Sequence, residues 1–371
     1  MTGKLNVPRL ERWLADRFNS ASLTLSSLRP AGTGFSATTF FALLASDSST
    51  REIVIRMEQP GQQVFLDSDI KTQVAVMDAL VSNALPAPRV LAFEDDPAIL
   101  GGRTIVMGRV GGRDFPQSPG YATAGWVKNL SAADRTILWR NALTTLGTIN
   151  RLTPEAGFSF LDKPQYGPTG LDQYLGWLTA WRQETIGNNI HSLIDRGLDH
   201  LVRHQPAHAP PSFVWGDSNP CNMLFDDDLS VSAILDFEAA AIGPGEIDLG
   251  WWLFMDRSRV GDKPLPGVPS RSTSIAIYQA ALGRSVQDID YYEILAGVRM
   301  AIVIVRTADR LIEAGFLQDA GDAKTHNPAA ALLATLLGRS GHEPGQGYRA
   351  YARAAGAHHQ SHATEAVADG G

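Results

Sequence analysis

Three polar residues have the types and the spacing that phosphoryl transfer requires: Asp217, Asn222 five residues later, and Asp236. A carboxylate such as Asp217 can orient the hydroxyl group that attacks a phosphoryl group. An amide oxygen and a second carboxylate can hold a magnesium ion on the phosphates. Mg²⁺ binds hard oxygen ligands in a nearly octahedral arrangement and usually shares them with substrate phosphates. The spacing therefore predicts a catalytic carboxylate at Asp217 and metal ligands at Asn222 and Asp236.

The segment between Asn222 and Asp236 predicts a β-hairpin that brings these two residues together. Residues 222–225 and 231–235 are short apolar runs, and the acidic residues 226–228 between them are turn formers. In such a hairpin Asn222 begins one strand and Asp236 ends the other, so both side chains can reach one cation. Asp and Asn singly are more typical of simple turns, and it is the joint spacing that favours a metal site.

The motif resembles the catalytic core of the aminoglycoside-phosphotransferase-like family, which has the protein-kinase-like fold. The family pattern is His-Gly-Asp, four residues and Asn, then a hairpin, Asp-Phe/Trp-Glu, Gly-Pro and Asp-Leu. The resemblance extends over roughly residues 25–255 and most resembles the subgroup that includes the kinase-like domains fused to acyl-CoA dehydrogenases. The matching residues here are Trp215-Gly216-Asp217, Asn222, Asp236-Phe237-Glu238, Gly243-Pro244 and Asp248-Leu249.

This resemblance implies an α+β fold of two lobes, a small N-lobe built on an antiparallel sheet and a mainly helical C-lobe. The N-terminal pattern is consistent with such a small lobe, because runs of strand type alternate with two amphipathic helical segments. The expected elements are a helix over 8–20, strands over 23–28, 38–44 and 52–57, a helix over 69–82, and strands over 89–93 and 104–110.

The loop over residues 29–36 contains two glycines and joins the first two predicted strands. By itself it is more typical of a hairpin turn. Counted together with the downstream motif, it predicts a loop whose backbone N–H groups, around Ser36, cover nucleotide phosphates.

The resemblance implies further nucleotide-binding residues. Met107, Arg109 and Val110 lie where the family has the hinge whose backbone meets the adenine edge. Arg56 stands where the third strand has a phosphate-binding lysine, and Gln73 stands where a helix glutamate pairs with that lysine. Arginine can contact phosphates with two N–H groups but is not equivalent to lysine. The chain therefore departs from the family at both partners of this ion pair.

Three other motif residues have supporting or undecided roles. Asp248 is expected to tie the following helix to the catalytic loop rather than to do chemistry. Glu238 either assists metal binding or lines the acceptor site. Trp215 stands where the family usually has a histidine that supports the loop, and this replacement is expected to be tolerated.

The lobe boundary is expected near Gly112, with a nucleotide-binding lobe over 1–111 and a catalytic and acceptor lobe over 112–355. From residue 356 the chain is rich in small and polar residues and poor in large apolar ones, which predicts a disordered tail over 356–371. Apolar residues at helical spacing predict the helices of the large lobe over 132–152, 171–186, 191–204, 247–255 and 291–314.

Composition limits the possible functions. A chain of 371 residues suits two lobes, and a net charge of −7 without a basic run argues against nucleic-acid binding. The single cysteine excludes an internal disulfide framework and a cysteine-based zinc site. The N-terminus has no apolar signal core, and no apolar run is long enough to span a bilayer, so we expect no membrane association and a cytoplasmic location. The sequence does not indicate an oligomeric state.

The leading hypothesis is an ATP-dependent kinase that acts on a hydroxyl group of a small molecule, with Asp217 on the acceptor, Mg²⁺ on Asn222 and Asp236, and Arg56 on the phosphates. Arg56 and Gln73 also motivate a non-catalytic, nucleotide-binding pseudokinase, and a metal-dependent hydrolase could use the same carboxylates. Retention of all three motif residues favours the kinase. The acceptor cannot be read from the sequence, although the subgroup resemblance implies hydroxyacyl thioesters or other hydroxylated metabolites.

Overall fold

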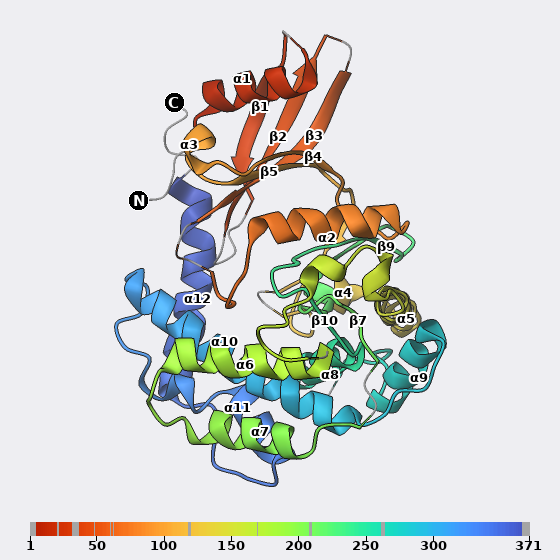
Figure 1. The fold of residues 1–371 in the computed structure, drawn as a ribbon, viewed down its shortest axis with the longest axis vertical. Helices are drawn as coiled ribbons and strands as arrows, with labels where there is room; N and C mark the ends of the chain where they lie inside the picture. Colours follow the sequence, from red (N-terminus) through yellow and green to blue (C-terminus); the bar gives the residue numbers. More distant parts are fainter. Residues whose placement is uncertain are drawn as a thin grey trace.

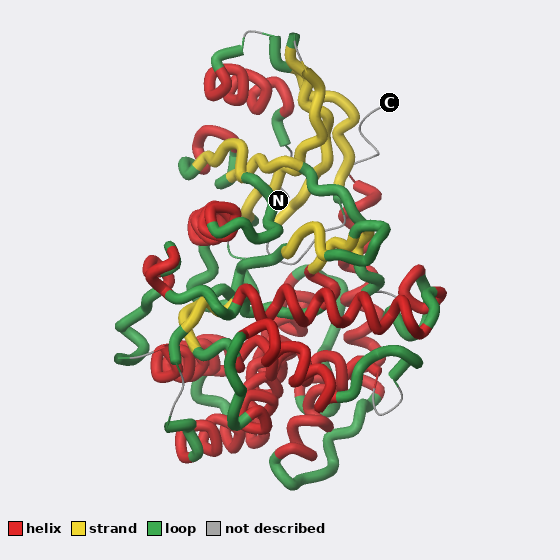
Figure 2. The backbone as a smooth tube through the Cα atoms, turned by 90° about the vertical axis from the view of Figure 1, so that its right-hand side faces the viewer, coloured by secondary structure: helices red, strands yellow, loops and turns green. Residues whose placement is uncertain are grey.

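A small lobe built on a β-sheet stands above a larger helical lobe (Figure 1). The structure is a computed structural model, and it describes residues 5–20, 22–31, 37–47, 49–59, 61, 63–117, 120–168, 170–207, 210–260 and 264–365. Strands lie in the small lobe and at the junction, while helices make up most of the rest (Figure 2). This is the two-lobed α+β arrangement expected from the sequence.

The small lobe is built on a five-stranded antiparallel sheet with the order β1-β2-β3-β5-β4. Its five strands are β1 (Thr24–Pro30), β2 (Ala37–Ser46), β3 (Ser49–Glu58), β4 (Val90–Glu94) and β5 (Thr104–Gly108). Helix α1 (Val7–Phe18) contributes Leu10, Trp13 and Leu14 to the core on one face of this sheet.

The alternation of side chains along β3 directs Arg56 to the face of the sheet opposite this core. Ile53 and Ile55 are fully buried in the core with α1, whereas Arg56 is partly buried and pairs across the sheet with Thr39 and Ile105. The opposite face looks toward the large lobe, so the strand register places Arg56 at the junction.

Helix α2 (Ile70–Ser82) connects the two lobes. Asp69 caps its N-terminus by accepting a hydrogen bond from the N–H of Lys71. The helix lies between the sheet and the large lobe (Figure 1), and its buried residues Met77 and Leu80 belong to the same apolar core as Leu138 of the large lobe. The small lobe therefore rests on the large one through an apolar contact, and the boundary near Gly112 stays a prediction.

The large lobe is organised around α10 (Ile289–Glu313), which is buried along most of its length and packs against α7, α8 and α11. No helix in the described ranges is long and apolar enough to cross a membrane. The other helices are α3 (Pro97–Leu100), α4 (Trp126–Asn129), α5 (Ala132–Ile149), α6 (Gly170–Ile186), α7 (Ser192–Arg203), α8 (Glu246–Val260), α9 (Arg271–Leu282), α11 (Pro328–Leu336) and α12 (Gln346–Glu365), with 3-10 turns at Pro154–Ala156, Ser159–Leu161, Pro220–Asn222 and Gly321–Lys324.

Two small antiparallel sheets hold the motif segment. β8 (Met223–Phe225) pairs with β9 (Val231–Ile234), which confirms the predicted hairpin, and β6 (Arg113–Asp114) pairs with the other edge of β8. β7 (Ser212–Val214) pairs with β10 (Ala241–Gly243). The strand that leads into Asp217 is therefore anchored to the segment that follows Asp236.

The predicted disorder from residue 356 is wrong as far as Glu365, because α12 continues to that residue. The helix enters this segment from the alanine-containing run over 350–355, and alanine has the highest intrinsic helix propensity. Ala354 is buried with Leu311 and Leu317, and the ring of His358 packs edge-to-face on Phe316 at 5.1 Å between centroids. Small residues do not exclude order when they lie against another helix. Helices α9 and α11 were not anticipated, and residues 366–371 lie outside the described residues.

Candidate active site

The buried carboxylate of Asp248 holds the backbone of the loop that carries Asp217. Its Oδ2 accepts hydrogen bonds from the N–H of Trp215 at 2.7 Å and from Nδ2 of Asn150 at 2.8 Å, and its Oδ1 accepts one from the N–H of Gly216 at 2.8 Å. Burial raises the pKa of Asp248, while these hydrogen bonds act to lower it. The expected structural role of Asp248, tying α8 to the loop, is confirmed.

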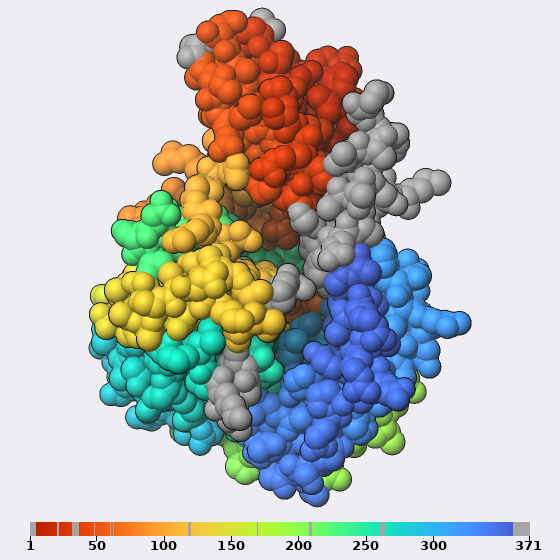
Figure 3. All heavy atoms as spheres, turned by 180° about the vertical axis from the view of Figure 1, so that it is seen from behind, coloured from red at the N-terminus to blue at the C-terminus, as the bar shows by residue number. Residues whose placement is uncertain are grey.

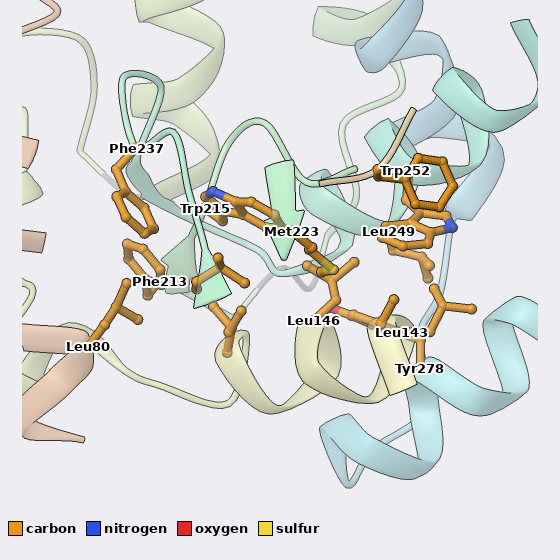
Figure 4. Packing of buried hydrophobic residues seen from close by; sticks show 14 of the residues in the cluster. Leu80, Leu143, Leu146, Phe213, Trp215, Met223, Phe237, Leu249, Trp252 and Tyr278 are labelled. Atoms are coloured by element: carbon orange, nitrogen blue, oxygen red, sulfur yellow. The ribbon is translucent and has the colours of Figure 1, made fainter. Parts of the chain in front are cut away.

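Trp215 replaces the family histidine and links the loop to the metal-binding segment. Its indole is fully buried in the core below the loop, beside Met223 and Phe213 (Figure 4). Its Nε1 donates to the carbonyl oxygens of Leu235 at 2.9 Å and of Asp236 at 3.1 Å. Trp215 therefore supports both ends of the motif.

Gly216 occupies a position that has no room for a side chain. Its φ is +93°, and an added Cβ would lie 2.1 Å from the carbonyl oxygen of Ala239. We expect Gly216→Ala to destabilise the protein by roughly 1–3 kcal/mol or more, because the substituted residue would be strained in φ and would also collide with backbone. Thermal unfolding measures this effect.

The matched control for this prediction is Gly187→Ala. Gly187 also has a positive φ, +63°, but an added Cβ there would meet nothing within 4 Å. Gly187→Ala therefore measures the cost of the positive φ alone, whereas Gly216→Ala adds the cost of the steric collision. Equal melting temperatures for the two variants would contradict the steric argument.

The Asp217 carboxylate is held by three neutral donors. Nε1 of Trp251 donates to Oδ1 at 2.8 Å, and Nδ2 of Asn219 donates to the same oxygen at 3.1 Å. Nδ2 of Asn222 donates to Oδ2 at 2.6 Å. Sequence reasoning missed Trp251, although its place one helical turn after Asp248 was an available signal. These bonds fix the direction of the carboxylate without neutralising it.

Asn222 and Asp236 present the oxygen chemistry that Mg²⁺ requires. Because Nδ2 of Asn222 is used by Asp217, its Oδ1 is the amide atom that remains for a cation. Burial, and next the neighbouring Glu238 carboxylate, raise the pKa of Asp236 to about 7, while Arg56 opposes the rise. A buried carboxyl with such a high pKa lacks sufficient counter-charge, which a divalent cation supplies. The residues present therefore fit a magnesium ion.

An ion at this position would depend on substrate oxygens as well. In the described ranges, no group of three or more His, Cys, Asp or Glu side chains is arranged to hold a metal. One carboxylate and one amide oxygen leave most octahedral positions open, as is usual for Mg²⁺ shared with phosphates.

A cavity of about 580 Å³ lies between the lobes and brings most of the predicted residues together. The space-filling view shows the narrower small lobe above the wider large lobe (Figure 3). Asp217 is not among the lining residues and lies beside Asn222, whereas Ser36 lies outside the described residues. The predicted residues that line the cavity are Arg56, Met107, Arg109, Val110, Asn222 and Asp236.

Among the predicted hinge residues, Arg109 already has donors engaged. Its backbone N–H donates to the carbonyl of Glu52 at 3.1 Å, and its guanidinium pairs with the Glu52 carboxylate at 2.5 Å. The guanidinium also lies over the ring of Phe41 at 4.8 Å. Arg109 thus forms part of the cavity wall, and Met107 and Val110 line the same cavity.

Arg56 has a negative partner that differs from the helix glutamate of the family pattern. Its guanidinium forms an ion pair with the carboxylate of Glu238, and the two side chains are only 20% and 7% exposed. Gln73 is buried and lines the same cavity. The Arg56 guanidinium is therefore oriented by Glu238, in the segment that follows Asp236, and not by a residue of helix α2. The pair joins residues 182 positions apart, so sequence spacing could not predict it.

A model of the phosphotransferase enzyme family matches residues 27–274. The chain is 25% identical over 256 residues to acyl-CoA dehydrogenase family member 11 of Rattus norvegicus, covering 66% of this chain and 30% of that protein. It is 23% identical over 258 residues to an Arabidopsis thaliana protein named "Probable acyl-CoA dehydrogenase IBR3", covering 65% and 30%. The chain thus spans about a third of the length of these relatives.

The fold also matches a solved structure. A candidate aminoglycoside phosphotransferase from Ralstonia eutropha superimposes with a TM-score of 0.68 at 20% identity, over 94% of this chain and 99% of that chain. The protein-kinase-like fold expected from the motif is therefore confirmed.

Proposed function

Because this chain belongs to the phosphotransferase enzyme family, we propose that it is a kinase that transfers the γ-phosphoryl group of ATP to a hydroxyl group of a small molecule. The observation that carries the proposal is the convergence of three motif residues at one cavity edge. Asn222 and Asp236 line the cavity between the lobes, Asn222 is bonded to Asp217, and Arg56 lines the same cavity from the sheet. These are the parts that phosphoryl transfer needs, since it depends mainly on positioning and charge stabilisation.

In the proposed mechanism, the Asp217 carboxylate orients the acceptor hydroxyl and accepts its proton. Its direction is set by Trp251 and Asn222, which hold one oxygen each. Asn222 and Asp236 would hold Mg²⁺, which when bound neutralises charge on the phosphate oxygens. Arg56 supplies a positive charge from the sheet side, and residues Met107 and Val110 line the region proposed for the base.

We also propose the lobe division at residues 1–111 and 112–355, with the nucleotide between them. The acceptor would bind beside Asp217 on the large lobe. The similarity to acyl-CoA dehydrogenase family members supports hydroxyacyl thioesters or other hydroxylated metabolites as acceptors to be screened first. A screen of alcohols for ATP-dependent phosphorylation by the wild-type chain tests the proposal, and failure of every acceptor while ATP still binds would favour the pseudokinase.

Arg56→Ala is expected to weaken ATP binding by about ten- to a hundredfold and to leave adenosine binding nearly unchanged. A hydrogen bond to a charged group contributes roughly 1.5–3 kcal/mol, and only ATP offers phosphates to Arg56. Arg56→Lys should restore part of the loss, because Glu238 can still orient an ammonium although the fork geometry is gone. Calorimetric titration with ATP and with adenosine measures both affinities.

The matched control is Arg51→Ala. Arg51 lies five residues earlier on the same strand and places its guanidinium over Phe18, on the α1 side of the lobe. This variant should bind ATP as the wild type does. Equal loss of ATP and adenosine binding in Arg56→Ala would mean general damage to the lobe and would count against a phosphate contact.

A further inference from the structure

A fully buried guanidinium lies beneath the catalytic loop. Arg299 of α10 is 0% exposed, and its Nη1 donates to the carbonyl oxygen of Gly216. Its Nε and Nη2 are buried and have no hydrogen-bond partner among the described residues. Burying a charge with so few hydrogen bonds is costly, and an apolar side chain of similar size would fill the space at lower cost. Space filling alone therefore does not account for an arginine at this position.

The same guanidinium holds the indole that orients the catalytic carboxylate. It lies over the ring of Trp251, 4.2 Å from the ring centroid, and over the ring of Phe65, 5.1 Å from that centroid. Phe65 belongs to the segment that precedes α2. Nε1 of Trp251 donates to Oδ1 of Asp217 at 2.8 Å. A desolvated cation–π contact is worth about 2 kcal/mol or more, enough to restrict the ring to one orientation. Arg299 thus acts on Asp217 through Trp251.

Arg299 also acts on the peptide that precedes Asp217. The N–H of Gly216 donates to Oδ1 of Asp248 at 2.8 Å, and the carbonyl oxygen of Gly216 accepts from Arg299. The Asp248 carboxylate therefore holds the Trp215–Gly216 peptide by its N–H, and the Arg299 guanidinium holds the next peptide, Gly216–Asp217, by its carbonyl oxygen. The charge of Arg299 also acts to lower the pKa of Asp248. Gly216, whose φ of +93° favours glycine, is therefore held on both its N–H and its C=O.

We propose that Arg299 and Trp251 are positioning residues for the phosphoryl acceptor step, which set the direction of the Asp217 carboxylate through the Gly216 peptide and the Trp251 indole. This inference rests on the proposed function of Asp217. Neither residue belongs to the motif, and both lie on helices of the large lobe, α8 and α10. We expect both residues to affect the chemical step and not nucleotide binding, because neither lines the cavity proposed for the nucleotide.

The kinetic test compares Trp251→Phe with Trp252→Phe. Both changes remove one N–H from a buried indole of α8, but Nε1 of Trp252 has no hydrogen-bond partner among the described residues. We expect Trp251→Phe to lower kcat about tenfold or more, the worth of one hydrogen bond to a charged group, with an unchanged KM for ATP. Trp252→Phe should keep kcat close to the wild-type value. Equal losses of kcat in the two variants would overturn the assignment.

Arg299→Met and Arg299→Lys extend the test to the guanidinium, with Arg135→Lys as the control. Arg135 is a second buried arginine, in α5, and donates to backbone carbonyls away from the loop, among them that of Pro266 at 2.7 Å. We expect lower kcat in Arg299→Met, partial recovery in Arg299→Lys, and losses of stability alone in Arg135→Lys. Loss of kcat in proportion to lost melting temperature across all three variants would mean that Arg299 is only structural.

Amide hydrogen exchange gives a readout that does not need activity. Exchange at Trp215, Gly216 and Asp217 should be faster in Arg299→Met than in the wild type, and unchanged in Arg135→Lys. Unchanged exchange at these three amides in Arg299→Met would overturn the proposal. If the wild type transferred no phosphoryl group, the kinase assignment would fail, yet the exchange measurement would still decide whether Arg299 fixes the loop.

Discussion

Replacing Asp217 by asparagine will abolish phosphoryl transfer while leaving the fold and nucleotide binding nearly intact. Proton acceptance by a positioned carboxylate contributes about 10²–10⁴-fold to rate, and an amide cannot provide it. The substitution keeps shape, and its Oδ1 can still accept the hydrogen bond from Trp251. The turnover number with a phosphorylatable acceptor, together with the dissociation constant for ATP, separates the chemical step from binding.

Asp226→Asn is the control for this variant. Asp226 is exposed at the turn between β8 and β9, and the variant should keep full activity. Near-wild-type turnover in Asp217→Asn would remove Asp217 from the catalytic role.

Replacing Asp236 by asparagine will remove Mg²⁺-dependent nucleotide binding and will stabilise the metal-free protein at pH 8. The pKa of this buried carboxyl is raised to about 7, above the ordinary value of an aspartate in the unfolded chain. The folded state therefore holds a proton that the unfolded state has lost between about pH 4 and pH 7. The stabilisation that this group contributes at low pH is lost as the pH rises through this window.

A shift of about three pKa units corresponds to roughly 4 kcal/mol at most. Asparagine carries no charge, so the variant should not lose this free energy of unfolding as the pH rises. It should therefore melt at a higher temperature than the metal-free wild type at pH 8. At pH 4 the difference should shrink, because the folded aspartate is then protonated and the unfolded one is about half protonated. Melting curves at the two pH values, with and without Mg²⁺ and ATP, measure the effect.

Asp228→Asn provides the matched control, since Asp228 is an exposed carboxylate of the hairpin turn. This variant should show the same difference in melting temperature between pH 4 and pH 8 as the wild type, and it should bind the nucleotide as the wild type does. If Asp236→Asn bound ATP with the same Mg²⁺ dependence as the wild type, Asp236 would not be a metal ligand.

Local sequence patterns were sufficient for the hairpin, for α2 and for the strand that carries Arg56. In each, the apolar period and the flanking turn or cap residues lie within one short, continuous stretch of the chain. The family motif then assigned roles to Asp217, Asn222 and Asp236, because their spacing along the loop and hairpin also fixes their spacing in space. The short strands β6 and β10 escaped notice because they contain only two and three residues.

The missed features are those that depend on contacts between distant parts of the chain. Glu238 reaches Arg56 across the lobe junction, and Arg299 reaches Gly216 from α10. Nothing in the spacing of these residues predicts the contacts, since they follow from how the lobes and helices pack. The helix that continues past residue 356 also depends on distant contacts, because Ala354 is buried with Leu311 of α10 and the ring of His358 packs on Phe316.

The most direct test of the kinase assignment follows ATP consumption and product formation together, with wild type and Asp217→Asn in parallel over a panel of hydroxylated metabolites. We expect Mg²⁺-dependent formation of ADP and one phosphorylated alcohol in equal amounts, by the wild type only. ATP binding without product from any acceptor would indicate a pseudokinase. ADP and free phosphate released at the same rate by both proteins, whether or not an acceptor is present, would contradict the assignment of Asp217 and of the kinase reaction.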